Sequence, residues 1–207
     1  MDELKLIFAS NLIRLRTAAG MTQAELGEQL NYSDKSISKW RTLLNHNKCE
    51  YDLDAVYFGH GSDVLDFNDV SVHTGKDTLC EMHTAGVLTG HADKILRGTV
   101  DFQRGAKRGV GHESEDVLLF SPNARNRTAP LILCGEEEVE GQHAASVGRL
   151  DESKLYYLRS RGLSEAQARR LMVDARFAPA IDKIPLESLQ DEVRENVAGR
   201  LNDELDG

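Results

Sequence analysis

Apolar residues recur at helical spacing at the start of the chain. Between residues 4 and 19 they fall three or four positions apart, at Phe8, Leu12 and Leu15. The segment Thr22-Gln-Ala-Glu25 has the spacing of a capping box, which predicts a second helix to about residue 30. Ser33 is suited to cap a third helix through Trp40. Capped helices around a tight turn are typical of a helix-turn-helix, so residues 1–42 are predicted to form a short, partial all-α segment of this type.

After residue 42 the pattern changes to short apolar and β-branched runs separated by glycine. Such runs predict strands, here at residues 55–58, 70–72, 95–102, 117–120 and 131–133. The glycine-rich basic segment 105–111 fits no phosphate-binding motif and is interpreted as a β-turn. Without an exact repeat, strand patterning alone leaves a β-solenoid and a sandwich both open.

From Asp151 onward the pattern is helical again. Asp151 is a predicted cap and Gly162 a predicted stop, and Ser164-Glu-Ala-Gln167 forms a second capping box that leads to Phe177, before Pro179. Pro185 is suited to open a last helix. Apolar residues at steps of three and four predict one buried face on this helix: Leu186, Leu189, Val193, Val197 and Leu201.

Composition places the chain among soluble globular proteins, with 40 % hydrophobic and 29 % charged residues among 207. No apolar run approaches the roughly 18 residues of a membrane span, and the start lacks the features of a signal peptide, so we expect a cytoplasmic protein with no membrane partner. The net charge is −9, while residues 1–42 carry six Lys and Arg against five Asp and Glu. The acidic remainder would repel nucleic-acid phosphates, so DNA binding is expected only from the first segment.

Motifs of independent catalysis are missing from the sequence. There is no phosphate-binding loop, nucleophile elbow or dinucleotide fingerprint, and the histidines show no zinc-protease spacing. The cysteines Cys49, Cys80 and Cys134 stand far apart and form no CxxC pair, which argues against a disulfide framework or a zinc ribbon. A non-enzymatic protein is therefore expected.

A long stretch resembles a known family. The segments His112-Glu-Ser-Glu-Asp-Val-Leu-Leu-Phe-Ser-Pro122 and Arg125 to Ala166, with Gln142-His-Ala-Ala-Ser-Val-Gly148 inside the second, resemble the SufB/SufD family of iron-sulfur cluster assembly scaffolds, closest to SufD. The resemblance covers residues 44 to about 200. It implies a right-handed parallel β-helix over residues 43–150, truncated relative to a full-length member, followed by an α-helical region over 151–207.

The resemblance also implies a site. It places His143 on the histidine implicated in cluster assembly on the SufD subunit, and a neutral imidazole is a suitable iron ligand. We therefore expect transient iron at His143 and a passing iron-sulfur cluster at a subunit interface, with no stably bound cofactor. Some relatives have a cysteine where this chain has Gly141, so Cys134 is the candidate thiolate, facing His143 from a neighbouring strand.

Two partners follow from the resemblance, a SufB-type scaffold subunit and a SufC-type ABC ATPase. The helical region around residues 155–185 is expected to dock the ATPase, with its own packing on the β-helix as an equally open interpretation. The docking candidates are Leu155, Leu158, Leu171, Met172 and Phe177.

The competing hypothesis is a transcriptional regulator of the Cro/repressor type that binds DNA through residues 22–41. The scaffold-derived part would then act as a sensing or dimerisation domain. Gln23 would lie near phosphate at the first turn of the second helix. The residues expected to face base edges are Asp34, Lys35, Ser36 and Lys39.

Overall fold

Two parallel sheets stacked on each other form the body of the described protein. The computed structural model describes residues 36–206, with the side chains of residues 40–202. One sheet has the strand order β1-β3-β5-β7, with β8 also paired to β5, and the other has the order β2-β4-β6-β9. The elements are β1 (Ser36–Leu44), β2 (Glu50–Gly59), β3 (Val64–His73), β4 (Leu79–Leu88), β5 (Asp93–Phe102), β6 (Gly109–Leu119), β7 (Arg125–Thr128), β8 (Leu131–Cys134), β9 (Val139–Arg149), α3 (Glu152–Ser160), α4 (Glu165–Ile181) and α5 (Glu187–Asp206).

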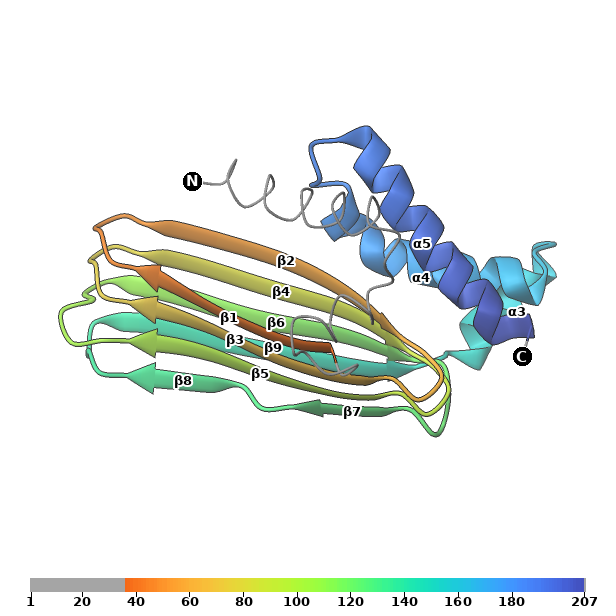
Figure 1. The fold of residues 1–207 in the computed structure, drawn as a ribbon, viewed down its shortest axis with the longest axis horizontal. Helices are drawn as coiled ribbons and strands as arrows, with labels where there is room; N and C mark the ends of the chain where they lie inside the picture. Colours follow the sequence, from red (N-terminus) through yellow and green to blue (C-terminus); the bar gives the residue numbers. More distant parts are fainter. Residues whose placement is uncertain (1–35, 207) are drawn as a thin grey trace, which may run out of the picture. The chain divides into compact units, whose positions relative to one another are not determined.

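From β1 to β6 successive strands alternate between the two sheets, then β7 and β8 both pair with β5 before the chain returns to the second sheet at β9, so it winds as a solenoid (Figure 1). In the second sheet Glu50 pairs with Leu79, and Gly109 pairs with Val139, so one coil takes about 30 residues. Every pairing between the strands from β2 to β9 is parallel. The parallel β-helix with helices after it, implied by the family resemblance, is confirmed.

One turn of each coil is built on a left-handed backbone residue. Lys48, Asp77 and Arg108 have φ of 59°, 55° and 57° at equivalent places in three successive coils. The amide of each donates to a carbonyl one coil further on, at Lys76, Lys107 and Glu138. The segment 105–111 contains one of these turns, which confirms its interpretation as a turn.

Inward-facing residues alternate with outward-facing ones along each strand, as the pleat requires. In β5 the buried positions are Lys94, Leu96, Gly98, Val100 and Phe102. The interior is tight enough to require a glycine at residue 86, where a Cβ would overlap the ring of Tyr57. The Tyr57 ring thus crosses β4 at Gly86, and its hydroxyl donates a hydrogen bond to Glu115 of β6.

The three helices follow the solenoid, and α4 and α5 cover part of the outer face of the second sheet (Figure 1). Their caps are as predicted: Asp151 accepts amide hydrogen bonds at the start of α3, and Ser164 and Gln167 form the capping box of α4. The buried face of α5 at Val197 and Leu201 packs within its own chain. The apolar cluster joins Phe58, Ala85, Val87, Leu118, Val173, Phe177, Ile181, Val197 and Leu201.

The predicted end of the helix that becomes α4 was wrong. The helix continues through Pro179 to Ile181, because proline removes a single amide donor, and Asp182 still donates to the carbonyl of Ala178. Burial of Ile181, 3 % exposed, against the sheet stabilises this last turn. Within the described residues no helix is long and apolar enough to cross a membrane.

The predicted helix from Ser33 through Trp40 is wrong over residues 36–40, which lie in β1. β1 is the hydrogen-bonded neighbour of β3 in the sheet, and pairing with that strand outweighs a cap signal there. Ser36 and Lys39, proposed as base-contacting residues of a recognition helix, therefore belong to a strand. Gln23, Asp34 and Lys35, with the rest of the helix-turn-helix prediction, lie outside the described residues.

Candidate functional site

The last coil of the β-helix carries His143 on its inner side. A Cβ at Gly141 would lie 2.8 Å from Ile132 Cγ2 and 3.3 Å from the ring of Phe102, so position 141 faces the interior. Side chains two residues apart in a strand share a face, which puts His143 on the same inner face of β9. β9 is the last strand in its sheet order, and His143 is exposed. The histidine thus stands at the end of the solenoid interior.

A buried carboxyl lies one strand below this histidine. His143 pairs in register with Glu113 of β6, and Glu113 pairs with Met82 of β4, so the three side chains occupy one inner column. Glu113 is 6 % exposed, and its Oε2 has no hydrogen-bond partner. Glu113 is not among the site residues predicted from the sequence, although its alternation with buried Gly111 and Glu115 along β6 indicates an inward position.

Cys134 also faces the interior of the last coil, but it lies away from His143. It pairs in register with the fully buried Phe102 and is itself exposed. Gly141 lies against Ile132. Cys134 lies two residues beyond Ile132, and His143 lies two residues beyond Gly141 on the other side of this contact. The two side chains are therefore four residues apart along the coil, which is roughly 13 Å at about 3.3 Å per residue. The structure therefore does not bring this thiol together with the imidazole within one chain.

A second polar cluster lies deeper between the sheets. The Lys94 ammonium forms an ion pair with Glu115 and donates to Asn126 Oδ1 at 3.0 Å. Glu115 also accepts hydrogen bonds from Tyr57 at 3.2 Å and from Thr128. Because Asn126 and Thr128 belong to β7, this cluster fastens the last coil to β5 and β6 directly beneath it and, through Tyr57, to β2.

The outer face of the second sheet carries imidazoles beside acidic groups. His112 Nδ1 lies 2.8 Å from Glu81, and its Nε2 lies 3.8 Å from Glu140, so the ring links three strands. His83 Nδ1 is 2.9 Å from the Ser114 hydroxyl. In the part of the chain that the structure describes, no three His, Cys, Asp or Glu side chains are grouped to hold a metal ion.

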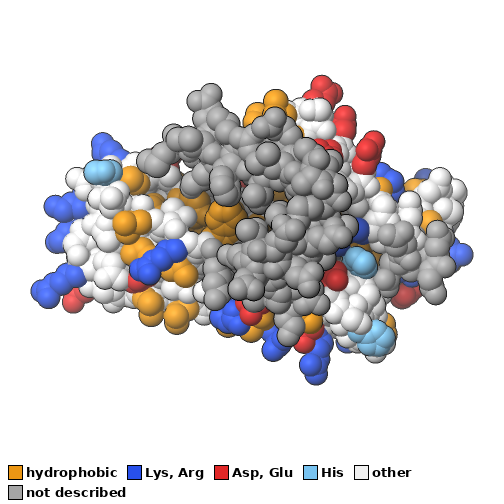
Figure 2. Space-filling model, in the orientation of Figure 1, with side chains coloured by type: hydrophobic (Ala, Val, Ile, Leu, Met, Phe, Trp, Pro, Cys, Tyr) orange, Lys and Arg blue, Asp and Glu red, His pale blue; other side chains and the backbone are white. Residues whose placement is uncertain are grey.

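Basic side chains gather at the end of the coils that carries the left-handed turns, toward the left of the face in Figure 2. Two of them are paired between coils: Arg108 contacts Asp77 at 2.6 Å, and Lys107 lies 3.8 Å from Glu138. The guanidinium of Arg108 lowers the pKa of Asp77. These charges therefore contribute to stacking of the turns.

The five candidates for ATPase docking separate by burial. Leu155 and Phe177 are 4 % and 1 % exposed, so they serve the packing of the helices and present little surface to a partner. Leu158 and Met172 are half-buried, and Leu171 is 46 % exposed.

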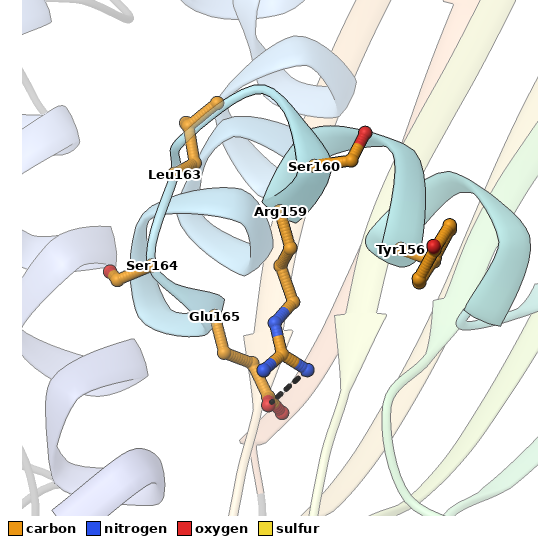
Figure 3. Close-up of a pocket in the computed structure, with 6 residues that line it drawn as sticks. All are labelled: Tyr156, Arg159, Ser160, Leu163, Ser164 and Glu165. Atoms are coloured by element: carbon orange, nitrogen blue, oxygen red, sulfur yellow. Dashed lines mark hydrogen bonds and ion pairs between the residues drawn. The ribbon is translucent and has the colours of Figure 1, made fainter.

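Two exposed aromatic residues on α3 are not among the docking residues predicted from the sequence. Tyr156 and Tyr157 are 76 % and 55 % exposed, and Tyr156 borders an open depression between α3 and the start of α4 (Figure 3). Arg159 and Glu165 point toward each other across it, with 3.5 Å between Nη1 and Oε2. Leu163 and the hydroxyls of Ser160 and Ser164 complete its lining. The surface around α3 thus combines an aromatic ring, apolar atoms and a paired charge.

Comparison with known proteins covers most of the chain. The family model described as "SUF system FeS cluster assembly, SufBD core domain" matches residues 11–176. The match begins inside the segment predicted to be a helix-turn-helix, well before residue 44, where the resemblance was expected to start.

Named relatives agree with this family. The iron-sulfur cluster assembly protein SufD of Bacillus subtilis (strain 168) is 32 % identical over 155 residues, which cover 75 % of this chain and 36 % of that protein. A SufBD family protein of Pyrococcus horikoshii is 29 % identical over 175 residues, 81 % of this chain and 39 % of the relative. The chain thus spans less than half the length of these two relatives. Because the family model matches well over half of the sequence and the fold is a parallel β-helix, the chain belongs to the SufBD family of iron-sulfur cluster assembly components.

Proposed function

We propose that this chain is a SufD-like scaffold component of the SUF machinery, which pairs with a SufB-type subunit through its last coil and with a SufC-type ATPase through its helices. The observation that carries the proposal is the position of His143, exposed on the inner face of the terminal strand β9. A histidine at the open end of a solenoid is available to a group held by a second subunit.

The terminal coil has the features of an edge that pairs with another chain. β9 is eleven residues long, and nearly all of it is exposed. A long exposed edge strand offers unpaired backbone groups for strand addition from a partner. In such a complex the imidazole of His143 would contribute one ligand to a cluster in passage, and the partner would supply thiolates, the usual ligands of iron-sulfur clusters. Cys134, about 13 Å along the same coil by strand geometry, would contribute as a separate thiol.

The surface around α3 and α4 supports ATPase docking. Tyr156, Tyr157 and Leu171 expose large apolar groups on neighbouring helices, and aromatic residues are enriched in protein interfaces. The depression beside Tyr156 makes this surface concave, and its lining residues Arg159 and Glu165 are available to a charged group of the partner. Leu155 and Phe177 would support this surface from within.

Co-purification tests the docking. The full chain is co-expressed with a SufB-type subunit and a SufC-type ATPase, and the mass of the complex is measured by size exclusion with light scattering. Leu171→Glu and Tyr156→Ser should release the ATPase and leave the SufB-type subunit bound. Leu186→Glu is the matched control, because Leu186 is 59 % exposed immediately before another helix, α5. Retention of the ATPase by both surface variants would reject this docking face.

Cluster assembly tests the role of His143. In the assembled complex, His143→Ala should lower the iron content and the visible absorption after anaerobic reconstitution, while the mass of the complex is unchanged. Gln142→Ala is the control, because Gln142 is exposed on the same strand with its side chain on the opposite face. Equal cluster yield in wild type and His143→Ala would remove His143 from the site.

A further inference from the structure

A primary amine, a carboxyl and a carboxamide meet in the buried polar cluster between the sheets. Lys94 of β5 pairs in register with Asn126 of β7, and Lys94 Nζ lies 3.0 Å from Asn126 Oδ1. The side chain of Lys94 is fully buried, and its ammonium forms an ion pair with Glu115 of β6, whose side chain is 1 % exposed. A nucleophile, an acid-base group and an acyl group are therefore in contact.

The surroundings of the amine are apolar and aromatic. Lys94 Nζ lies 5.4 Å from the centroid of the Tyr57 ring, and this ring packs on Phe67 with 5.2 Å between centroids. Burial lowers the pKa of Lys94, and the neutral amine is the form that attacks a carbonyl carbon. The buried apolar residues clustered with Tyr57 are Leu65, Leu88, Ala92, Val117 and Ala124.

A closed ring of hydrogen bonds joins the amine nitrogen to the carboxamide nitrogen. Glu115 Oε1 contacts Lys94 Nζ, and Glu115 Oε2 accepts a hydrogen bond from the Thr128 hydroxyl. The Thr128 hydroxyl in turn accepts from Asn126 Nδ2 at 3.3 Å. Glu115 can therefore take a proton from Lys94 at one oxygen and pass one toward Asn126 Nδ2 from the other, through Thr128.

The carboxamide carbon of Asn126 is within reach of the amine. This carbon is bonded to Oδ1, so it lies no more than about 4.2 Å from Lys94 Nζ. A small rotation of the carboxamide brings it to the roughly 3–3.5 Å from which a bond forms. Groups held this close in one fold react as if at concentrations far above any in solution, so an amine and an amide that are inert in water can combine.

We propose that Lys94 and Asn126 join in an isopeptide bond, a covalent amide between the two side chains, with Glu115 as the catalytic acid and base. Glu115 takes a proton from the ammonium, Lys94 Nζ attacks Cγ of Asn126, and the Cγ–Nδ2 bond breaks. Two protons from Nζ reach the leaving nitrogen by way of Glu115 and Thr128. The products are one Nζ–Cγ amide, one ammonium ion and the Glu115 carboxylate. Nothing is oxidised or reduced, and no co-reactant is needed.

The bond cross-links β5 to β7 and so fixes the last coil to the coil beneath it. The ion pair is the state before reaction. The cluster is separate from the candidate iron ligand, because the β6 residue paired with His143 is Glu113, whereas Glu115 pairs with Ala145. The reaction takes place within one chain, so it does not depend on the proposed function.

Mass spectrometry of the soluble full chain tests the bond. The denatured wild-type chain is weighed directly after purification and again after several days of incubation. Reaction makes it lighter by one ammonia, about 17 Da. Trypsin should then release a branched peptide in which residues 77–97 are joined to residues 126–127, because trypsin does not cleave after a modified Lys94.

Three variants define the chemistry. Asn126→Ala and Glu115→Gln should keep the full mass of their sequences, because the first lacks the acyl group and the second lacks the acid-base group. Asn123→Ala is the matched control, because Asn123 is an exposed asparagine shortly before β7. This control should lose ammonia as the wild type does. Loss of ammonia by Glu115→Gln at the wild-type rate would remove Glu115 as the catalyst.

The wild-type readings decide the matter even where a variant does not fold. An unchanged mass after incubation would overturn the proposal. So would loss of ammonia without the branched peptide, because an asparagine can also cyclise onto its own backbone. Neither reading includes a partner subunit, so failure of the bond and failure of the proposed function remain separate results.

Discussion

Lys94 and Glu115 form an ion pair sealed inside the β-helix, with side-chain exposures of 0 % and 1 %. The pair joins the two sheets, since Lys94 lies on β5 and Glu115 on β6. Asn126 and Thr128 close it from above, and Tyr57 donates to it from two coils below. A fully satisfied network of this kind specifies how coils stack, because any shift in register leaves a buried charge without its partner.

Removal of one member of the pair should be strongly destabilising. Lys94→Met leaves the Glu115 carboxylate buried without its cation, and we expect a loss of about 3–5 kcal/mol in the free energy of unfolding at pH 7. The double variant Lys94→Met/Glu115→Gln should recover much of this loss, because no net charge remains buried. Urea denaturation of the three proteins measures both effects. Equal stability of the single and double variants would show that the ion pair is not the source.

Gly86 should resist enlargement. A Cβ there would overlap the Tyr57 ring, so Gly86→Ala should cost about 1–3 kcal/mol through overpacking. Tyr57→Leu in the same chain should reduce the additional cost of Gly86→Ala, because the obstructing ring is gone. At Gly148 a Cβ would meet nothing within 4 Å, so Gly148→Ala should stay within about 0.5 kcal/mol in the same thermal or urea assay. A similar loss at both glycines would contradict the packing argument.

Acid should destabilise the protein through His73. Its ring is fully buried, and burial lowers its pKa to about 4, while Nδ1 lies 2.8 Å from the Thr78 hydroxyl. The unfolded chain binds this proton near pH 6.5, so stability falls as the pH drops from about 6.5 through 4, by roughly 3 kcal/mol in total.

The measurement is the difference in unfolding free energy between wild type and His73→Leu at pH 7 and at pH 4.5. This difference cancels the opposing pH dependence of Asp69 and Glu113, because burial raises the pKa of these two carboxyls to about 6 and about 7 and both proteins contain them. A difference that does not change with pH would exclude His73 as an acid-sensitive group.

Phe177 and Leu171 should behave differently although they lie on the same helix. Phe177→Ala should cost about 3–5 kcal/mol, because the ring is 1 % exposed in the cluster beneath α4 and α5. Leu171→Ala should change stability by less than about 0.5 kcal/mol, because the side chain is 46 % exposed. Urea midpoints compare the two. Comparable losses would mean that Leu171 contributes to packing and is a poor choice for testing docking.

Much of the architecture was accessible from local signals. The caps at Asp151 and Ser164 place two helix starts correctly, because a cap is a short-range hydrogen bond that the sequence encodes directly. Strands with alternating apolar residues, such as β5, were also predicted. β9 was not, because most of its residues are exposed and the strand has no apolar alternation to detect.

The candidate site was predictable only in part. The family resemblance selected His143, but the position of Glu113 beside it depends on register between coils some 30 residues apart. Residues 36–40 were predicted to be helical because Ser33 is suited to cap a helix. Pairing with β3 places them in a strand instead. In a solenoid, long-range stacking decides such cases, and a single sequence does not display it.

The left-handed turn residues Lys48, Asp77 and Arg108 have a consequence for how such chains change in length. Their amides bond to the next coil through backbone atoms, so this hydrogen bond between coils does not depend on which side chain the turn residue carries. Insertion or loss of a whole winding leaves every remaining joint intact, whereas a change of a few residues within one winding would break the ladder. Homologous proteins can thus differ by entire windings and still share one interior, with divergent side chains filling it.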